Sequence, residues 1–131
     1  MKKFVLLIPI LLLSLSIYVN AADCGGAVRC YCGDTVTSNH TMTYDIPNCA
    51  RNGPDAALKV NSAVTLNCQG HTISGTGHGF GVRFEGGSSH VVRNCVVLNF
   101  DNGIRNDAAT NAQVLDSVFS YNTQTSVTFG G

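Results

Sequence analysis

The side chains that could do chemistry lie mainly in the second half of the chain. His78 stands between two glycines, and Asp101 and Asp107 flank Arg105. An arginine could act as a base beside carboxylates that bind calcium. Calcium, however, takes about six to eight oxygen ligands, and Asp116 is the only further carboxylate nearby. Solvated turn residues give the same pattern. His78, Asp101, Arg105 and Asp107 are therefore candidates for ligand contact, and neither a catalytic group nor a metal site is expected.

Cysteines offer a second kind of chemistry. They are Cys24, Cys30, Cys32, Cys49, Cys68 and Cys95. In an exported chain an even number of cysteines predicts disulfides, although the sequence does not choose among the many pairings. A bond between Cys68 and Cys95 is one hypothesis, because these residues fall in adjacent repeats. The rival interpretation is a metal site on Cys30-Tyr31-Cys32, but it lacks a second close pair and a histidine at ligand spacing. No cofactor is expected.

The N-terminal segment, residues 1–21, has the composition of an export signal. Lys2 and Lys3 precede an apolar run over residues 4–17, and Val19-Asn20-Ala21 fits a signal-peptidase site. The run is shorter than the ~20 residues of a membrane span, and an uncleaved anchor is the alternative. After cleavage, 6 basic side chains remain against 8 acidic ones, which argues against nucleic acid and an anionic membrane surface. We expect a secreted, periplasmic or cell-surface protein.

Apolar residues recur with one period, and this period indicates the fold class. The triplet Gly81-Val82-Arg83 returns as Gly103-Ile104-Arg105, which gives a period of about 22 residues, in the range of repeat architectures. Three columns are expected: Leu58 and Val60 opposite Phe80 and Val82, continuing to Ile104 and Val127; Leu66, Val92 and Val114; and Ile73, Val97 and Phe119. Such a period is typical of solenoids, in which equivalent positions of successive coils stack on one another and carry the same class of residue. An antiparallel sandwich is the alternative, but its geometry would not require three apolar columns to recur with the same period.

The predicted fold is therefore all-β: a right-handed, single-stranded parallel β-helix of about four coils. Residues 1–21 would be a signal peptide, residues 22–34 a cysteine-rich N-terminal cap, and residues 35–131 the coils, with an open C-terminal end. Val36, Met42, Tyr44 and Ile46 are expected to point inward, and residues 85–90 to form a surface loop. Solenoids need polar caps, and none is visible at the end of the chain. The sequence thus predicts a truncated chain or an end that pairs with a partner.

Three segments resemble a known family. They are Cys24-Gly-Gly-Ala with Cys30-Tyr-Cys-Gly-Asp, Val64-Thr-Leu-Asn-Cys-Gln-Gly-His-Thr-Ile73, and His90-Val-Val-Arg-Asn-Cys-Val-Val97. They are similar to the right-handed parallel β-helix repeat proteins of the pectate-lyase-like superfamily, which includes NosD-like proteins. The resemblance covers nearly all of the chain after residue 21. It implies the fold and not the activity, because the superfamily holds lyases, hydrolases, epimerases and adhesins.

A hydrolase would need more than this chain offers. Gly77-His78-Gly79 is similar to the Gly-His-Gly of polygalacturonase-type enzymes, but the Asn-Thr-Asp motif and the Asp-Asp pair are missing, and glycosidic cleavage needs two placed carboxyl groups. We expect an exported, non-catalytic repeat module for surface structure or glycan binding. The alternative is the N-terminal fragment of a carbohydrate-active enzyme, a polysaccharide lyase or glycoside hydrolase. The expected partners are a polysaccharide or cell-surface glycan, and a second copy bound end to end.

Overall fold

The computed structural model describes residues 22–50 and 56–129, with side chains up to residue 124. The segment predicted to be a signal peptide, residues 1–21, lies outside this part. In the described residues every element is a β-strand. The same residues include no helix that is long and apolar enough to cross a membrane.

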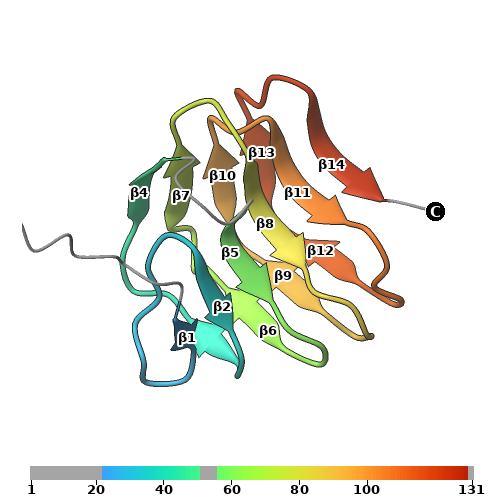
Figure 1. Ribbon diagram of the computed structural model, residues 1–131. Coiled ribbons are helices and arrows are strands. Elements are labelled where there is room, and N and C mark those ends of the chain that lie inside the picture. Colours follow the sequence, from blue (N-terminus) through green and yellow to red (C-terminus); the bar gives the residue numbers. More distant parts are fainter. Residues whose placement is uncertain (1–21, 51–55, 130–131) are drawn as a thin grey trace, which may run out of the picture.

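The strands form three parallel sheets (Figure 1). The first sheet contains, in spatial order, β1 (Asp23–Cys24), β2 (Asp34–Val36), β5 (Ala56–Val60), β8 (Phe80–Phe84), β11 (Asn102–Asn106) and β14 (Thr125–Phe129). The second contains β3 (His40–Thr41), β6 (Thr65–Asn67), β9 (Val91–Arg93) and β12 (Gln113–Leu115). The third contains β4 (Ile46–Cys49), β7 (Thr72–Gly75), β10 (Val96–Leu98) and β13 (Val118–Ser120).

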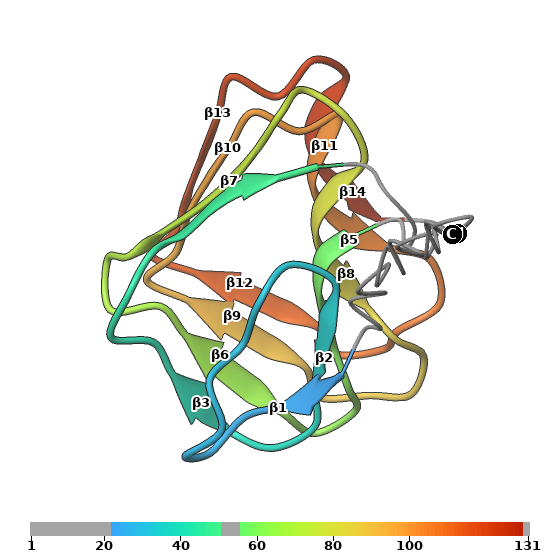
Figure 2. The ribbon, with the colours of Figure 1, turned by 60° about the vertical axis from the view of Figure 1, so that its left-hand side comes forward.

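Each coil passes once through the first, second and third sheets, so the stack has a triangular outline (Figure 2). From β5 to β14 the chain completes about three uninterrupted turns. Strands β2, β3 and β4 precede them, and their connection to β5, residues 51–55, lies outside the described residues. The predicted all-β parallel solenoid is therefore confirmed. The expected number of about four coils slightly exceeds the regular turns.

The strand registers test the three predicted columns. Leu66, Val92 and Val114 pair in one row, and Ile73, Val97 and Phe119 pair in another, as predicted. The prediction for Leu58 and Val60 was wrong, because they pair with Val82 and Phe84 and not with Phe80 and Val82. The physical reason lies in the return from the third sheet to the first. Strand β7 and the corner after it use residues 72–79, whereas β10 and the equivalent corner use only residues 96–101. The coil that begins with β5 is therefore longer than the next one.

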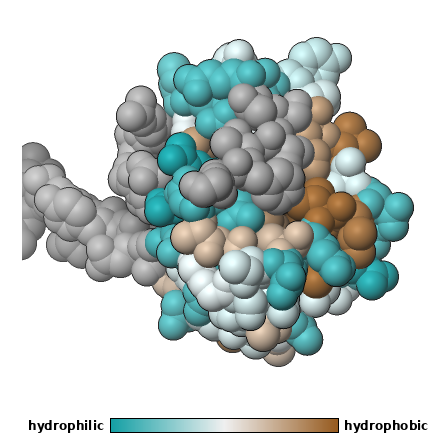
Figure 3. Space-filling model, turned by 90° about the vertical axis from the view of Figure 1, so that its right-hand side faces the viewer, coloured by the Kyte–Doolittle hydropathy of each residue, from teal (hydrophilic) through white to brown (hydrophobic). Residues whose placement is uncertain are grey.

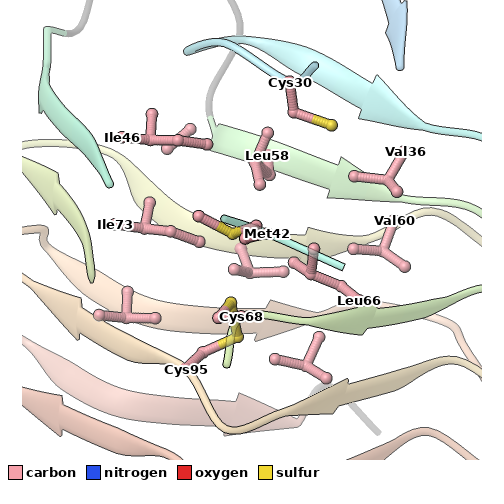
Figure 4. Packing of buried hydrophobic residues seen from close by; sticks show 14 of the residues in the cluster. Cys30, Val36, Met42, Ile46, Leu58, Val60, Leu66, Cys68, Ile73 and Cys95 are labelled. Atoms are coloured by element: carbon pink, nitrogen blue, oxygen red, sulfur yellow. A yellow bond between two sulfur atoms is a disulfide. The ribbon is translucent and has the colours of Figure 1, made fainter. Parts of the chain in front are cut away.

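The inside of the stack is apolar (Figure 4). Leu58, Val82 and Ile104 of the first sheet are fully buried, since alternate residues of a strand point to opposite faces. In the first coil the expected inward residues Val36, Met42 and Ile46 are buried, whereas Tyr44 is only half-buried. Burial of these columns from water is the main favourable term in folding.

The corners use residues that tolerate a left-handed backbone. Asn94 (φ 53°) and Asp116 (φ 46°) occupy equivalent corners between the second and third sheets; asparagine and aspartate adopt this conformation more readily than other side chains. The expected loop at residues 85–90 connects β8 to β9, and its glycines are exposed. Its last residue, His90, is fully buried and donates from Nε2 to the carbonyl oxygen of Glu85 at 2.6 Å.

Three disulfides hold the first half of the stack together. The bonds are Cys24–Cys30, Cys32–Cys49 and Cys68–Cys95. The last joins adjacent coils across a Cα–Cα distance of 4.8 Å, as hypothesised. In the N-terminal segment the buried carboxylate of Asp34 accepts hydrogen bonds from the backbone amides of Ala22 and Tyr31. The disulfides are consistent with an extracellular or secreted protein, because such bonds persist in oxidising compartments.

Candidate functional site

A row of cationic side chains runs along the outer face of the first sheet. Lys59 of β5, Arg83 of β8 and Arg105 of β11 are paired in register. Adjacent strands in a sheet lie ~4.8 Å apart, so the row carries one cation on each of three successive coils. Their neighbours along each strand point into the core, and the pleat therefore directs the three charged side chains to the surface. We call Lys59, Arg83 and Arg105 the cation row.

An aromatic ring lies beside this row. The Arg105 guanidinium carbon stands 4.7 Å from the centroid of the Phe80 ring, within the range of a cation–π contact. Phe80 faces outward because the alternation of the strand breaks at Gly81, which is buried together with Val82. A Cβ atom at Gly81 would overlap the side chain of Val97. Glycine at position 81 therefore allows two consecutive residues, Gly81 and Val82, to face the core, which leaves Phe80 at the surface.

Asp107 holds two members of the cation row in place. Its Oδ1 pairs with Nε of Arg105 at 2.5 Å, and its Oδ2 lies 3.6 Å from Nη2 of Arg83. The three side chains are about one third exposed, at 38% for Arg105, 32% for Arg83 and 37% for Asp107. Solvent screens exposed ion pairs, which contribute little to stability. The main effect of Asp107 is therefore to orient the guanidinium groups.

A second carboxylate occupies the equivalent place one coil earlier. Phe84 pairs with Asn106 in register, so Glu85 follows β8 as Asp107 follows β11. Three cations and two carboxylates thus share this face with the Phe80 ring. Guanidinium groups bind carboxylate and sulfate oxygens with paired hydrogen bonds, and an aromatic ring offers an apolar surface. The face can therefore bind a polar ligand that carries acidic groups.

The structure separates the four ligand-contact residues predicted from the sequence. Arg105 and Asp107 contact each other in the cation row. Asp101 lies at the corner before β11, where its Oδ2 accepts from the backbone amide of Gly79 and its Oδ1 from the hydroxyl of Thr123, at 2.9 and 3.0 Å. Its carboxylate therefore joins the corners of three successive coils. His78 is exposed at the equivalent corner before β8, away from the ion pairs of the row.

Sequence reasoning missed Lys59, Phe80 and Arg83 as site residues. The repeated glycine–apolar–arginine triplet was a usable signal, because it placed Arg83 at the same phase as Arg105. Phe80 carried no such signal. It was expected in the core column, and only the inward turn at Gly81 moves it to the surface.

A further polar contact lies at the corner between the second and third sheets. Oδ1 of Asp45 accepts a hydrogen bond from the backbone amide of Thr72 at 2.8 Å and contacts Nδ1 of His71 at 3.1 Å. The Thr72 hydrogen bond, followed by that of His71, lowers the pKa of Asp45 below its ordinary value of 3.8. This pair joins adjacent coils. Within residues 22–50 and 56–129 no three His, Cys, Asp or Glu side chains come together as a metal site.

Exposed apolar side chains gather at the last described coil. Figure 3 shows the molecule from the end where β14 lies, with hydrophobic residues on one side of this face. Leu115, Val118 and Tyr121 belong to this coil and are 43%, 55% and 80% exposed. Such side chains offer few hydrogen bonds to a sugar. The expected end-to-end contact between two copies would use this end of the stack, and it stays a prediction.

Comparison with known proteins assigns no family. No family model, no curated protein and no solved structure matches this chain. The solenoid is therefore established by the strand registers, and the chemistry of the site has to be argued from its own residues.

Proposed function

We propose that this protein is an exported, non-catalytic β-helix module that binds acidic glycans on the outer face of its first sheet. The observation that carries the proposal is the cation row, with Lys59, Arg83 and Arg105 in register on three successive coils. Like charges on directly paired strand positions repel each other. Asp107 offsets part of this repulsion through its contacts with Arg83 and Arg105, and anionic groups bound along the row would offset the rest.

The shape of the row suits a polymer. A linear acidic polysaccharide lying parallel to the axis of the stack would meet a cation at each coil, at a spacing that the sheet keeps constant. The Arg105 guanidinium is already oriented by Asp107 and by the Phe80 ring, so little rotamer freedom would be lost on binding. Preorganisation of this kind favours affinity.

Membership of the pectate-lyase-like superfamily is part of this proposal. It rests on the resemblance of the Cys24–Asp34, Val64–Ile73 and His90–Val97 segments and on the parallel solenoid. That superfamily contains both carbohydrate-active enzymes and binding proteins, so the fold is compatible with glycan binding but does not specify it.

An enzymatic role is the second candidate. Glu85 and Asp107 stand at equivalent ends of β8 and β11, and a pair of carboxyl groups is what glycosidic cleavage requires. Both oxygens of Asp107 are engaged by arginine side chains, which argues for a positioning role. Release of reducing ends or of unsaturated sugars from a uronic-acid polymer would favour the enzyme.

The test is binding of the exported protein to polygalacturonate, with a neutral polysaccharide as the comparison, by isothermal titration calorimetry. We expect saturable binding to the acidic polymer alone, weakening as salt screens the charges. Arg105→Gln should weaken it roughly tenfold, which corresponds to ~1.4 kcal/mol. Arg29→Gln, which removes the same charge from the N-terminal cap, is the matched control. Equal binding by wild type and Arg105→Gln would contradict the proposal.

A further inference from the structure

A polar hollow lies on the outer face of the second sheet, a different face from that of the cation row. Its volume is about 280 Å³, and it is lined by Asn39, His40, Thr41, Thr65, Asn67 and Arg93. These residues come from β3, β6 and β9 or from the residue just before them, and the three strands lie side by side in Figure 2. All six lining side chains are polar, and none is a carboxylate.

The strand registers fix the walls of the hollow. Thr41, Asn67 and Arg93 occupy one row across three coils. A second contact crosses the coils beside it, because the backbone amide of Thr65 donates to Oδ1 of Asn39 at 2.9 Å. The hollow is therefore built on sheet strands and not on a loop, so its polar groups keep their relative positions.

The two asparagine side chains have defined orientations. A backbone N–H can only donate, so the atom of Asn39 that contacts the amide of Thr65 must be the carbonyl oxygen. The same holds for Asn67, whose Oδ1 accepts from the backbone amide of Gln69 at 3.1 Å and from Nδ2 of Asn94 at 3.1 Å. Both carbonyl oxygens are thus used within the protein. The Nδ2 donors are the polar ends that remain for a ligand.

The buried His40 also offers no acceptor to the hollow. The carbonyl oxygen of Gly26 can only accept, so Nδ1 of His40 carries a proton and donates to it at 3.1 Å. The other nitrogen, Nε2, contacts the Tyr44 hydroxyl at 3.0 Å, and that hydroxyl accepts from the backbone amide of Cys30 at 2.7 Å. Both ring nitrogens are engaged in these contacts, which fix the orientation of the His40 ring at the bottom of the hollow.

The hollow therefore presents mainly donors. Arg93 is exposed and has five N–H groups and no acceptor, the asparagines contribute Nδ2 groups, and the threonines contribute hydroxyls. We propose that this hollow is a second binding site, which takes the oxyanion of a small ligand, most directly the carboxylate of a sugar acid. The two oxygens of a carboxylate match the fork of Arg93, and the threonine hydroxyls suit the hydroxyls of the sugar.

The test is a titration of 15N-labelled protein followed by amide chemical shifts. The full chain is exported from a host that attaches no N-glycans, because Asn39-His40-Thr41 is a glycosylation sequon and a glycan on Asn39 would block the hollow. Galacturonate is the probe, galactose is its neutral counterpart, and inorganic phosphate is a second oxyanion. We expect saturable shifts of the Thr65, Asn67 and Arg93 amides with galacturonate and none with galactose.

The two acidic probes distinguish a sugar acid from an inorganic ion as the natural ligand. Weaker binding of phosphate identifies a sugar-acid site, whereas equal or tighter binding of phosphate supports the oxyanion site and assigns it to an inorganic ion. Arg93→Gln should weaken galacturonate binding about ten- to a hundred-fold, the range for a charge-assisted hydrogen bond, and Arg93→Lys should weaken it less. Arg29→Gln is the control of equal charge. Unchanged affinity in Arg93→Gln, or shifts confined to the Lys59 and Arg105 amides, would overturn the inference.

Discussion

Removing the Cys68–Cys95 disulfide should destabilise the protein more than removing either of the other two. The three bonds close loops with sequence separations of 27, 17 and 6 residues. In the chain-entropy description, these loops correspond to stabilisation of roughly 3.5, 3.1 and 2.2 kcal/mol through restriction of the unfolded chain. The inter-coil bond therefore contributes the most, and the bond within the cap contributes the least.

Loss of buried sulfur adds to this effect. Cys68 and Cys95 are 0% and 1% exposed, and Cys24 and Cys30 are nearly as buried, at 3% and 1%. Each change to alanine removes one buried heavy atom, worth roughly 1 kcal/mol. The double substitution Cys68→Ala/Cys95→Ala should thus lose about 5.5 kcal/mol, which approaches the whole stability of a small domain. The matched double substitution of Cys24 and Cys30 should lose about 4 kcal/mol, because its sulfur term is the same.

Urea unfolding followed by far-UV circular dichroism measures the difference, since the chain has no tryptophan to report on folding. We expect the midpoint to fall most for the Cys68/Cys95 variant, with a steeper dependence of the free energy on urea, because the unfolded chain exposes more surface without the cross-link. A smaller loss for this variant than for the Cys24/Cys30 variant would refute the loop argument. An unchanged urea dependence would show that the cross-link does not restrict the unfolded chain.

Three further predictions concern single residues. The Thr72 hydrogen bond lowers the pKa of Asp45 in the folded state. The Asp45 carboxylate therefore stabilises the fold above the pKa that it has in the unfolded chain, and this stabilisation is lost as the pH falls through the folded-state pKa. The thermal midpoints of wild type and Asp45→Asn should differ above about pH 4 and converge in stronger acid. Gly81→Ala should lose about 1–3 kcal/mol in urea unfolding, because its new methyl group overlaps the next coil, whereas Gly86→Ala, with open space around it, should lose almost nothing. Asp101→Ala should lose about 1–3 kcal/mol, because the donors at the corner lose their charged acceptor; full retention of stability would show that the corner does not depend on the carboxylate.

The period of the solenoid could be predicted from the sequence. In a stack of parallel coils, residues that pair in register are separated along the chain by the length of one coil. Val82 and Ile104 pair in the structure and are separated along the chain by one period of the repeat. The same spacing failed for Leu58, since β7 and the corner after it, residues 72–79, lengthen the chain between β5 and β8. Periodicity identifies the fold where the coils have equal lengths. It assigns the wrong strand-pairing partner where one coil is longer than the others.

The two proposed sites were predicted to different extents. Arg105 and Asp107 were recognised from their local pattern, and both lie in the cation row or beside it. The hollow on the second sheet was not recognised. Thr41, Asn67 and Arg93 share one row, but the steps between them along the chain are longer than the main period, and the donor character of the hollow depends on which atoms of Asn39 and Asn67 face the backbone. Side-chain orientation of this kind cannot be read from residue types.

Most of the variation in coil length falls at the corners. The corner after the first sheet is residues 61–64 in one coil and 85–90 in the next, and the corner after the second sheet changes from residues 68–71 to 94–95. The strands between them keep their registers. Insertions and deletions at corners can therefore accumulate during evolution without shifting the inward columns, while an outward position such as Lys59 can change alone. In such an architecture ligand specificity and folding can be inherited as nearly independent traits.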